Sequence, residues 1–217
     1  MNSKELVICT NPKSSVAESI RMLRTNLEFS FVDNDVNAVM ITSSIAKEGK
    51  SFVAANLACA FGMTKRKTLL VDCDLRKGRI ERIFGLKNKP GLSNLLLDDI
   101  YAYQDYIYTT DIGNLSVLPI GIVPPNPSEL LGSEKCQILF RYLKQDYDLI
   151  ILDCPPIADV ADALVLSKIA DEAVIVCAAN YTPADELTST KKALEQSGIK
   201  IAGVVVNKVE KDKKKRY

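Results

Sequence analysis

A segment of eight residues, numbered 44–51, most constrains what this chain can fold into. It reads Ser-Ile-Ala-Lys-Glu-Gly-Lys-Ser and matches the phosphate-binding loop pattern G-x-x-x-x-G-K-[ST], except that Ser44 replaces the first glycine. An apolar run, 38–41, precedes it and a helix-like run, 51–61, follows. In this pattern, backbone N–H groups and a helix N-terminus surround a polyphosphate. The lysine contacts the phosphates, and the hydroxyl is a ligand of Mg²⁺. The segment therefore predicts a nucleoside triphosphate site.

The rest of the chain alternates between short apolar runs and longer amphipathic segments. The runs are nearly continuous in apolar residues, as burial of both strand faces requires, and helical segments separate most of them. The predicted strands are residues 38–41, 68–71, 115–118, 149–152, 172–177 and 201–206. This pattern predicts an α/β fold of the P-loop NTPase type, with a mostly parallel central sheet and helices on both faces. Because no repeat or low-complexity linker divides the 217 residues, we expect a single domain over 1–217.

Composition excludes several classes of function. The 28 basic and 27 acidic residues nearly cancel, so no global field attracts nucleic acid. Histidine is absent, which removes Ser-His-Asp hydrolysis and His-ligated metals. The six cysteines are scattered, and no apolar run approaches the ~18 residues needed to cross a bilayer. We expect a cytoplasmic protein with reduced thiols, which would reach a membrane only through a partner.

Three aspartates follow predicted strands. Asp153 comes directly after the run 149–152, the usual position of a Walker B acid that holds Mg²⁺. Asp72 and Asp74 follow the run 69–71 and, two residues apart, can project to the same side. A single aspartate at a strand end often only caps a turn or helix. Three of them on strands that flank a phosphate-binding loop favour a phosphoryl-transfer site.

Four ordered motifs resemble those of the bacterial tyrosine kinases found in capsule and exopolysaccharide loci. Residues 72–76 are similar to the family's D-x-D-x-R motif, and 149–156 to its Walker B segment ending in Asp-x-Pro-Pro. Residues 124–131 match P-P-N-P-x-E-L-L. Glu18, Arg21 and Arg24 match E-x-x-R-x-x-R. The resemblance extends over about 12–208, nearly the whole chain.

The resemblance implies ATP as phosphate donor, Mg²⁺ as its partner, and a protein tyrosine hydroxyl as acceptor. It implies nucleotide contacts from Lys47, Glu48, Gly49, Lys50, Ser51, Phe52 and, against the adenine, Asn207. Its implied metal residues are Ser51, Asp74 and Asp153, and its implied catalytic residues are Lys50, Asp72, Asp74 and Asp153. Asp72 is the candidate base for the tyrosine. A guanine site would prefer N-K-x-D, and Glu210 occupies that last position.

The family also implies assembly. A leading helix over 12–31 would form a ring-like homo-oligomer, with Glu18, Arg21 and Arg24 on its solvent side and available to another chain. The alternative is an intrahelical Glu18–Arg21 pair on a solvated face. The family's kinases commonly need a transmembrane adaptor, which would recruit this chain to the inner face of the membrane.

The family usually ends in a cluster of tyrosines that neighbouring subunits phosphorylate, whereas this chain has a basic tail, 208–217, with Tyr217 alone at its end. We expect Tyr217 to be the phosphoacceptor. A second cluster, Tyr101, Tyr103, Tyr106 and Tyr108, has the spacing of an ordinary amphipathic helix.

The loop departs from the family's P-G-E-G-K-[ST]-T, because Ala46 and Lys47 replace Pro and Gly. Glycine permits a positive φ, so we expect weaker nucleotide binding than the consensus loop would give. Two alternatives to a kinase stay open. One is a regulatory ATPase of the MinD/ParA kind, against which Ile45 stands where that class has a signature lysine. The other is a nucleotide-binding scaffold without transferase activity.

Overall fold

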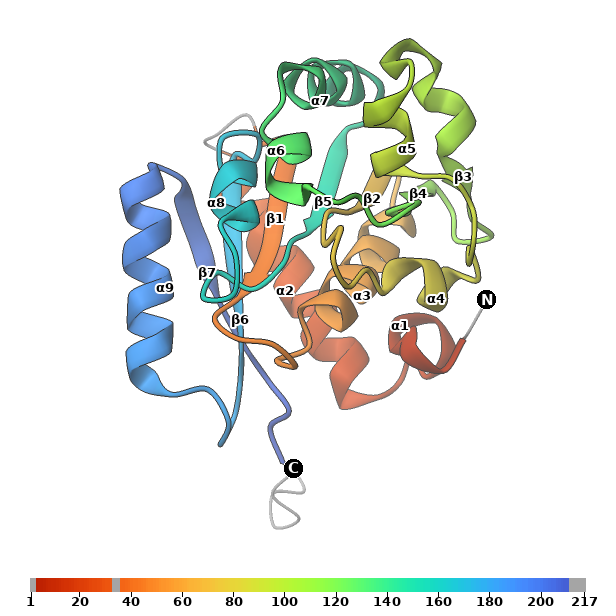
Figure 1. Ribbon diagram of the computed structural model, residues 1–217. Coiled ribbons are helices and arrows are strands. Elements are labelled where there is room, and N and C mark those ends of the chain that lie inside the picture. Colours follow the sequence, from red (N-terminus) through yellow and green to blue (C-terminus); the bar gives the residue numbers. More distant parts are fainter. Residues whose placement is uncertain (1–2, 33–35, 211–217) are drawn as a thin grey trace.

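The computed structural model of the chain describes residues 3–32 and 36–210 (Figure 1). Its described part contains one sheet with the strand order β3-β4-β2-β5-β1-β6-β7. The strands are β1 Ala38–Ser43, β2 Thr68–Asp72, β3 Tyr108–Thr109, β4 Leu115–Leu118, β5 Leu149–Asp153, β6 Glu172–Ala178 and β7 Lys200–Asn207. Every pairing is parallel except that of β3 with β4. The predicted mostly parallel sheet is confirmed. Strand β3 was missed because a strand of two residues has no detectable period.

Helices cover both faces of this sheet, as predicted. They are α1 Val7–Thr10, α2 Ser15–Phe31, α3 Lys50–Gly62, α4 Ile80–Phe84, α5 Leu92–Leu97, α6 Pro127–Leu131, α7 Glu134–Asp146, α8 Asp162–Leu166 and α9 Ala184–Ser197, with 3₁₀ helices η1 Ser3–Glu5 and η2 Ile100–Tyr106. Helices α1 to α4 pack on one face and α5 to α9 on the other (Figure 1). The sheet is therefore the middle layer of three.

Alternate residues of each central strand belong to the two opposite cores. In β1, Met40 packs in the cluster that contains Phe140 of α7, whereas Ile41 packs in the cluster that contains Leu57 of α3. Both strand residues are fully buried. Because successive side chains of a strand point to opposite faces, a strand with helices on both sides must be apolar throughout. This accounts for the uninterrupted apolar runs in the sequence.

The N-terminal segment contains two short elements that the sequence did not predict, η1 and α1. Helix α2 starts at Ser15 rather than at residue 12, because the Ser14 hydroxyl accepts the Ala17 N–H at 3.1 Å and caps the helix. Before it, η1 and α1 dock on α3 through the buried side chain of Asn56. Its Oδ1 accepts the Ile8 N–H at 3.0 Å and its Nδ2 donates to the Glu5 carbonyl at 2.9 Å.

The tyrosines at 101–108 do not form the predicted amphipathic α-helix. They lie on the 3₁₀ helix η2 and on β3. The Tyr103 hydroxyl donates to Asp146 at 2.7 Å, and the Tyr106 hydroxyl donates to Asp98 at 3.2 Å. Tyrosines at i, i+2, i+5 and i+7 did not justify a helical period in so short a segment. Across the described ranges, no helix combines the length and the apolar character that a bilayer crossing requires.

Candidate nucleotide-binding site

The predicted phosphate-binding loop joins the carboxyl end of β1 to α3, which begins at Lys50. Gly49 caps the helix with a φ of +97°, and Lys47 has a φ of +68° although it is not glycine. The positive φ at position 49 favours glycine, and a Cβ there would also lie 2.1 Å from Nδ2 of Asn207, so that side chain would have to move. Lys47 thus adopts, at a steric cost, a backbone conformation that the family's glycine at this position would adopt readily.

A cavity of about 560 Å³ lies against this loop. Its walls come from three segments that follow β1, β2 and β5. They are Ala46, Lys47, Gly49, Lys50, Ser51 and Phe52, then Asp74, Arg76, Lys77 and Arg79, then Pro155, Pro156, Asp159 and Val160. Five of these residues are cationic, which suits a polyanionic ligand. The cavity lies at the carboxyl ends of parallel strands, where sheets of this type bind their ligands.

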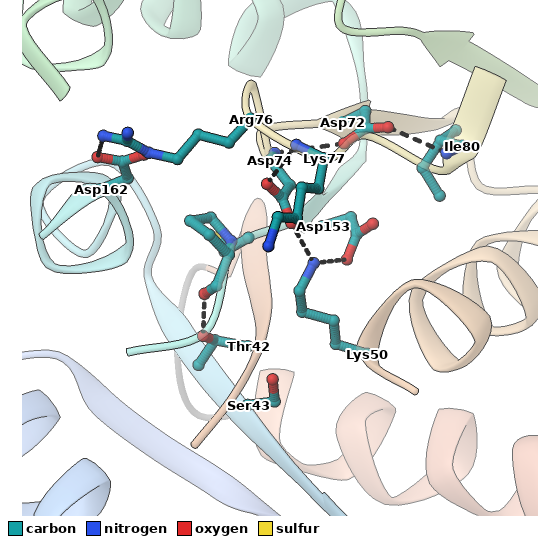
Figure 2. A network of polar contacts seen from close by, with 12 residues as sticks. Thr42, Ser43, Lys50, Asp72, Asp74, Arg76, Lys77, Ile80, Asp153 and Asp162 are labelled. Carbon is teal, nitrogen blue, oxygen red and sulfur yellow. Dashed lines mark hydrogen bonds and ion pairs between the residues drawn. The ribbon is translucent and has the colours of Figure 1, made fainter. Parts of the chain in front are cut away.

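Lys50 is the centre of the charged network (Figure 2). Its Nζ atom lies 2.8 Å from Oδ2 of Asp74 and 3.6 Å from Oδ1 of Asp153. Burial by itself lowers the pKa of this ammonium, but the carboxylates of Asp153 and Asp74 outweigh that effect and raise the pKa above its ordinary value. Lys50 is therefore a permanent cation at the mouth of the loop.

Asp153 is fully buried, and neither of its carboxylate oxygens accepts a hydrogen bond from the described part of the chain. Burial raises its pKa and the charge of Lys50 partly opposes that shift. Such oxygens, beside the carboxylate of Asp74 and the hydroxyl of Ser51, are of the kind that Mg²⁺ prefers. No cluster of three or more acidic or sulfur side chains suitable for a metal occurs in residues 3–32 and 36–210. The residues present fit a Mg²⁺ that also takes phosphate and water oxygens as ligands.

Asp72 does not line the cavity. Its side chain is fully buried, Oδ2 accepts the Ile80 N–H at 3.0 Å, and Oδ1 accepts the Asp74 N–H at 3.3 Å. Burial, with the nearby charge of Asp153, raises the pKa of Asp72 well above its ordinary value. Figure 2 shows Asp72 between Asp74 and Ile80, the two residues whose N–H groups it accepts. In this conformation Asp72 fixes the loop after β2, and its carboxyl is not part of the cavity wall.

Two residues predicted to contact nucleotide brace the loop instead. Glu48 is buried, accepts the Ile45 N–H at 2.8 Å, and also accepts the Thr182 hydroxyl. Asn207 donates from Nδ2 to the Glu48 carbonyl at 2.9 Å. Neither side chain is part of the cavity wall, whereas Lys47, Gly49, Lys50, Ser51 and Phe52 are.

Sequence reasoning missed one contact that joins two of the motifs. Arg76 of D-x-D-x-R forms a bidentate pair with Asp162, from Nε at 2.9 Å and Nη2 at 3.2 Å (Figure 2). Nη2 also donates to Oγ of Ser128 at 3.1 Å, and the Ser128 hydroxyl donates to Asp162. The Asp162 carboxylate is fully buried. The motifs containing Arg76 and Ser128 were recognised, but Asp162 belongs to neither, and only the fold brings it to them.

The prediction that Arg24 lies on the solvent side of α2 is wrong. This side chain is 25% exposed and donates from Nη1 to the Ala60 carbonyl near the end of α3 at 3.1 Å. Packing of α2 on α3 accounts for that orientation. Glu18 and Arg21 form the alternative intrahelical pair, 2.7 Å apart, and Arg21 also donates to the Pro12 carbonyl. The predicted acceptor Tyr217, with most of the predicted tail, lies outside the described residues.

A phosphate-binding loop, a lysine held between two strand-end carboxylates, and a cation-lined cavity on a parallel sheet define a P-loop nucleotide-binding protein. Consistent with this, a family model described as an AAA domain matches residues 36–198.

Comparison with curated proteins narrows the class. The chain is 39% identical over 212 residues to the putative tyrosine-protein kinase CapB of Staphylococcus aureus, which covers 98% of this chain and 92% of CapB. It is 38% identical to the tyrosine-protein kinase YwqD of Bacillus subtilis, covering 99% of this chain and 90% of YwqD. This chain belongs to the family of bacterial tyrosine-protein kinases.

Solved structures agree with that assignment. The crystal structure of the chimerical protein CapA2B2 superposes with a TM-score of 0.91 at 40% identity, covering 95% of this chain and 91% of that chain. The kinase domain of Escherichia coli tyrosine kinase ETK gives 0.90 at 34% identity, covering 98% and 83%. The MinD of Pyrococcus horikoshii complexed with Mg-ADP is more distant, with a TM-score of 0.67 at 26% identity, covering 78% of this chain and 69% of that one.

Proposed function

We propose that this chain transfers the γ-phosphoryl group of Mg-ATP to tyrosine hydroxyls of proteins, its own chain among them, and so regulates capsule or exopolysaccharide synthesis. The observation that carries the proposal is the position of Lys50, between Asp74 and Asp153 at a cavity built on a phosphate-binding loop. In the transfer, a bond forms between the tyrosine oxygen and the γ-phosphorus, and the bond from that phosphorus to the ADP oxygen breaks. The tyrosine proton passes to a carboxylate.

Each residue has a distinct part in this proposal. Lys50 and the loop amides bind the β- and γ-phosphates and offset the charge that spreads over them during transfer. Ser51, Asp74 and Asp153 would hold Mg²⁺, directly or through water, and when bound this ion would neutralise phosphate charge. We keep Asp72 as the candidate base, as the resemblance of residues 72–76 to the family's D-x-D-x-R motif implies. It would first have to release the N–H groups of Asp74 and Ile80.

The assembly is likewise a proposal. We propose a single kinase domain that acts in the cytoplasm, recruited to the membrane by a transmembrane adaptor. We also propose that residues 12–31 contribute to a homo-oligomer and that the tail carries the phosphoacceptor Tyr217. The exposed pair Glu18–Arg21 supports a contact there, whereas Arg24 is already engaged within its own chain.

A regulatory ATPase is the second candidate, since the MinD structures share the fold. Ile45, at the position of the signature lysine, speaks against it. A scaffold that binds nucleotide without transferring phosphate is the third.

One experiment separates the three candidates. The full chain is incubated with ATP and Mg²⁺, with and without the cytosolic fragment of a cognate adaptor. Phosphotyrosine is mapped by mass spectrometry and released phosphate is measured in parallel, with Lys50→Met as the control. Lys50-dependent phosphotyrosine supports the kinase. Phosphate release without phosphotyrosine supports the ATPase and overturns the kinase. If neither product forms, the scaffold is the remaining candidate.

A further inference from the structure

Three successive carbonyl groups of the phosphate-binding loop are held by side chains from the far end of the sequence. The Ala46 carbonyl accepts the Tyr181 hydroxyl at 3.3 Å, and the Lys47 carbonyl accepts Nζ of Lys208 at 2.6 Å. The Glu48 carbonyl accepts Nδ2 of Asn207 at 2.9 Å. We call Tyr181, Asn207 and Lys208 the carbonyl clamp. Tyr181 follows β6, and the other two end β7 or follow it, at one edge of the sheet (Figure 1).

The clamp is itself a connected unit. The ammonium of Lys208 lies 5.3 Å from the centroid of the Tyr181 ring, and the Lys208 N–H donates to Oδ1 of Asn207 at 2.8 Å. The Ala179 N–H donates to the Asn207 carbonyl at 2.9 Å, which joins the β6 end to the β7 end. The three donor side chains are therefore held in place relative to one another while they bind the loop carbonyls.

Backbone conformation also marks this region. Among the described residues, four non-glycine residues have a positive φ, and three of them are Lys47, Asn180 and Lys208. Residues with a Cβ avoid this conformation unless the surroundings impose it. Lys47 and Lys208 are joined by the 2.6 Å hydrogen bond, and Asn180 precedes Tyr181. The disfavoured conformations thus coincide with the contacts that hold the loop.

Because of peptide geometry, the clamp also fixes the N–H groups of the loop. In a trans peptide, the C=O of one residue and the N–H of the next point in opposite directions. Fixing the carbonyls of Ala46, Lys47 and Glu48 therefore fixes the N–H groups of Lys47, Glu48 and Gly49. In loops of this kind, these amides face the phosphates.

We propose that Tyr181, Asn207 and Lys208 are positioning residues that keep the loop amides turned toward the triphosphate. This loop lacks a glycine at position 47, and a lysine there disfavours the positive φ that the backbone adopts. Hydrogen bonds from the clamp, which lies outside the loop, hold the backbone in that conformation. It gives Asn207 a role different from the adenine contact implied by the family. The inference rests on nucleotide binding in the proposed function.

The test is a double-mutant comparison in two backgrounds, Lys47→Ala and Lys47→Gly. Both remove the same side-chain cation, but only glycine adopts a positive φ readily. Lys208→Met and Tyr181→Phe are made in each, and Mg-ATP dissociation constants are measured by calorimetry on the full chain. We expect each clamp variant to weaken binding about tenfold with alanine at position 47, because the competent loop becomes a minor population. With glycine, we expect about twofold or less.

Matched controls are Lys200→Met, at the other end of β7 where Lys200 pairs with Glu172, and Tyr108→Phe, whose hydroxyl donates to the Pro90 carbonyl. Both should leave Mg-ATP binding unchanged. An equal loss in the two backgrounds would show that the clamp does not act through residue 47, and no loss in either would show that it does not act at all. Either result overturns the proposal.

A second measurement keeps the clamp separate from the proposed function. Backbone ¹⁵N relaxation of residues 47–49 is recorded in nucleotide-free protein. We expect order parameters of ~0.85 in the parent, falling to less than ~0.6 in Lys208→Met. Unchanged order overturns the clamp even if ATP binds. Parent protein that shows the ordered loop but no heat with Mg-ATP contradicts the nucleotide function instead.

Discussion

The ammonium of Lys50 lies 2.8 Å from the carboxylate of Asp74, and each side chain is about one-tenth exposed. Asp153, fully buried, is the second acid within ion-pair distance of the same lysine. Asp72 adds a third buried carboxyl to this network. One cation thus balances an excess of acidic groups, an arrangement that favours arrival of a further cation such as Mg²⁺ with its nucleotide.

Removing the cation should destabilise the folded protein. We predict that Lys50→Met lowers the free energy of unfolding by about 3 kcal/mol, because Asp74 and Asp153 lose their buried counterion. For a chain of this length, that corresponds to a fall in melting temperature of about 6–12 °C. Differential scanning calorimetry without nucleotide measures it. An unchanged melting temperature would mean that the acids are already protonated.

Lys200→Met is the matched control, since Lys200 also pairs with a buried carboxylate, Glu172, at 2.7 Å. Half of the Lys200 side chain is exposed, so we expect a smaller loss of stability, about 1 kcal/mol or less.

Asp153→Asn should stabilise the nucleotide-free protein while impairing its function. It removes one of the buried negative charges, and we predict a gain of about 1 kcal/mol near pH 7. Mg²⁺ should no longer strengthen ATP binding, because a metal ligand is lost. Urea unfolding with and without the substitution, together with calorimetry of ATP binding, checks both effects.

The gain from Asp153→Asn should depend on pH. The pKa of Asp153 is raised in the folded state, so the folded protein binds more protons than the unfolded chain, and stability falls as pH rises through that pKa. The advantage of the asparagine variant should therefore vanish near pH 4, the ordinary aspartate range, and grow toward neutral pH. Urea titrations from pH 4 to 8 would refute this if the difference stayed constant.

Arg21 and Arg24 should behave differently when replaced. Arg24→Ala removes the hydrogen bond to the Ala60 carbonyl and should cost about 1 kcal/mol, with or without oligomers. Arg21→Ala loses an exposed pair and should change stability by less than about 0.5 kcal/mol. If this helix joins subunits, Arg21→Ala shifts the sedimentation profile toward monomer. A profile identical to that of the parent would exclude Arg21 from the interface.

Arg76→Lys should impair phosphoryl transfer more than folding. A lysine cannot reproduce the bidentate pair with Asp162 or the added contact to Ser128, so this wall of the cavity loses its fixed geometry. We expect kcat/KM for tyrosine phosphorylation to fall about tenfold, with a melting temperature within about 3 °C of the parent. Lys77→Arg, at another cationic position of the same cavity, is the control.

Local pattern predicted much of this molecule. The apolar runs were placed correctly, and so were the loop at 44–51 and the acids at or just after the ends of β2 and β5, since periodicity and residue type encode them over a few residues. The prediction was incomplete where a segment is too short to show a period, as with β3 and α1. It was wrong for Arg24, because helical spacing alone does not say which neighbour a helix packs against.

Residue roles that depend on partners far away along the chain were also not predicted from the sequence. Asp162 lies 86 residues from Arg76, and Tyr181 lies 135 residues from Ala46. Asp72 had the right residue type at the right strand end, yet its carboxyl faces backbone N–H groups of its own loop rather than the cavity. Burial and hydrogen-bond partners of a side chain follow from packing, which no short window contains.

By itself, the order of residues determined a parallel sheet with a phosphate-binding turn after its first strand and acids at neighbouring strand ends. These features arise from local periodicity, turn chemistry and strand burial. Only the tertiary structure decided that Lys50 pairs with Asp74 and that Asp72 is buried against the N–H groups of its own loop. It also decided that Tyr181, Asn207 and Lys208 donate hydrogen bonds to the carbonyls of residues 46–48. The physical reason is that these contacts depend on strand order and register, which bring the ends of β6 and β7 to the turn after β1.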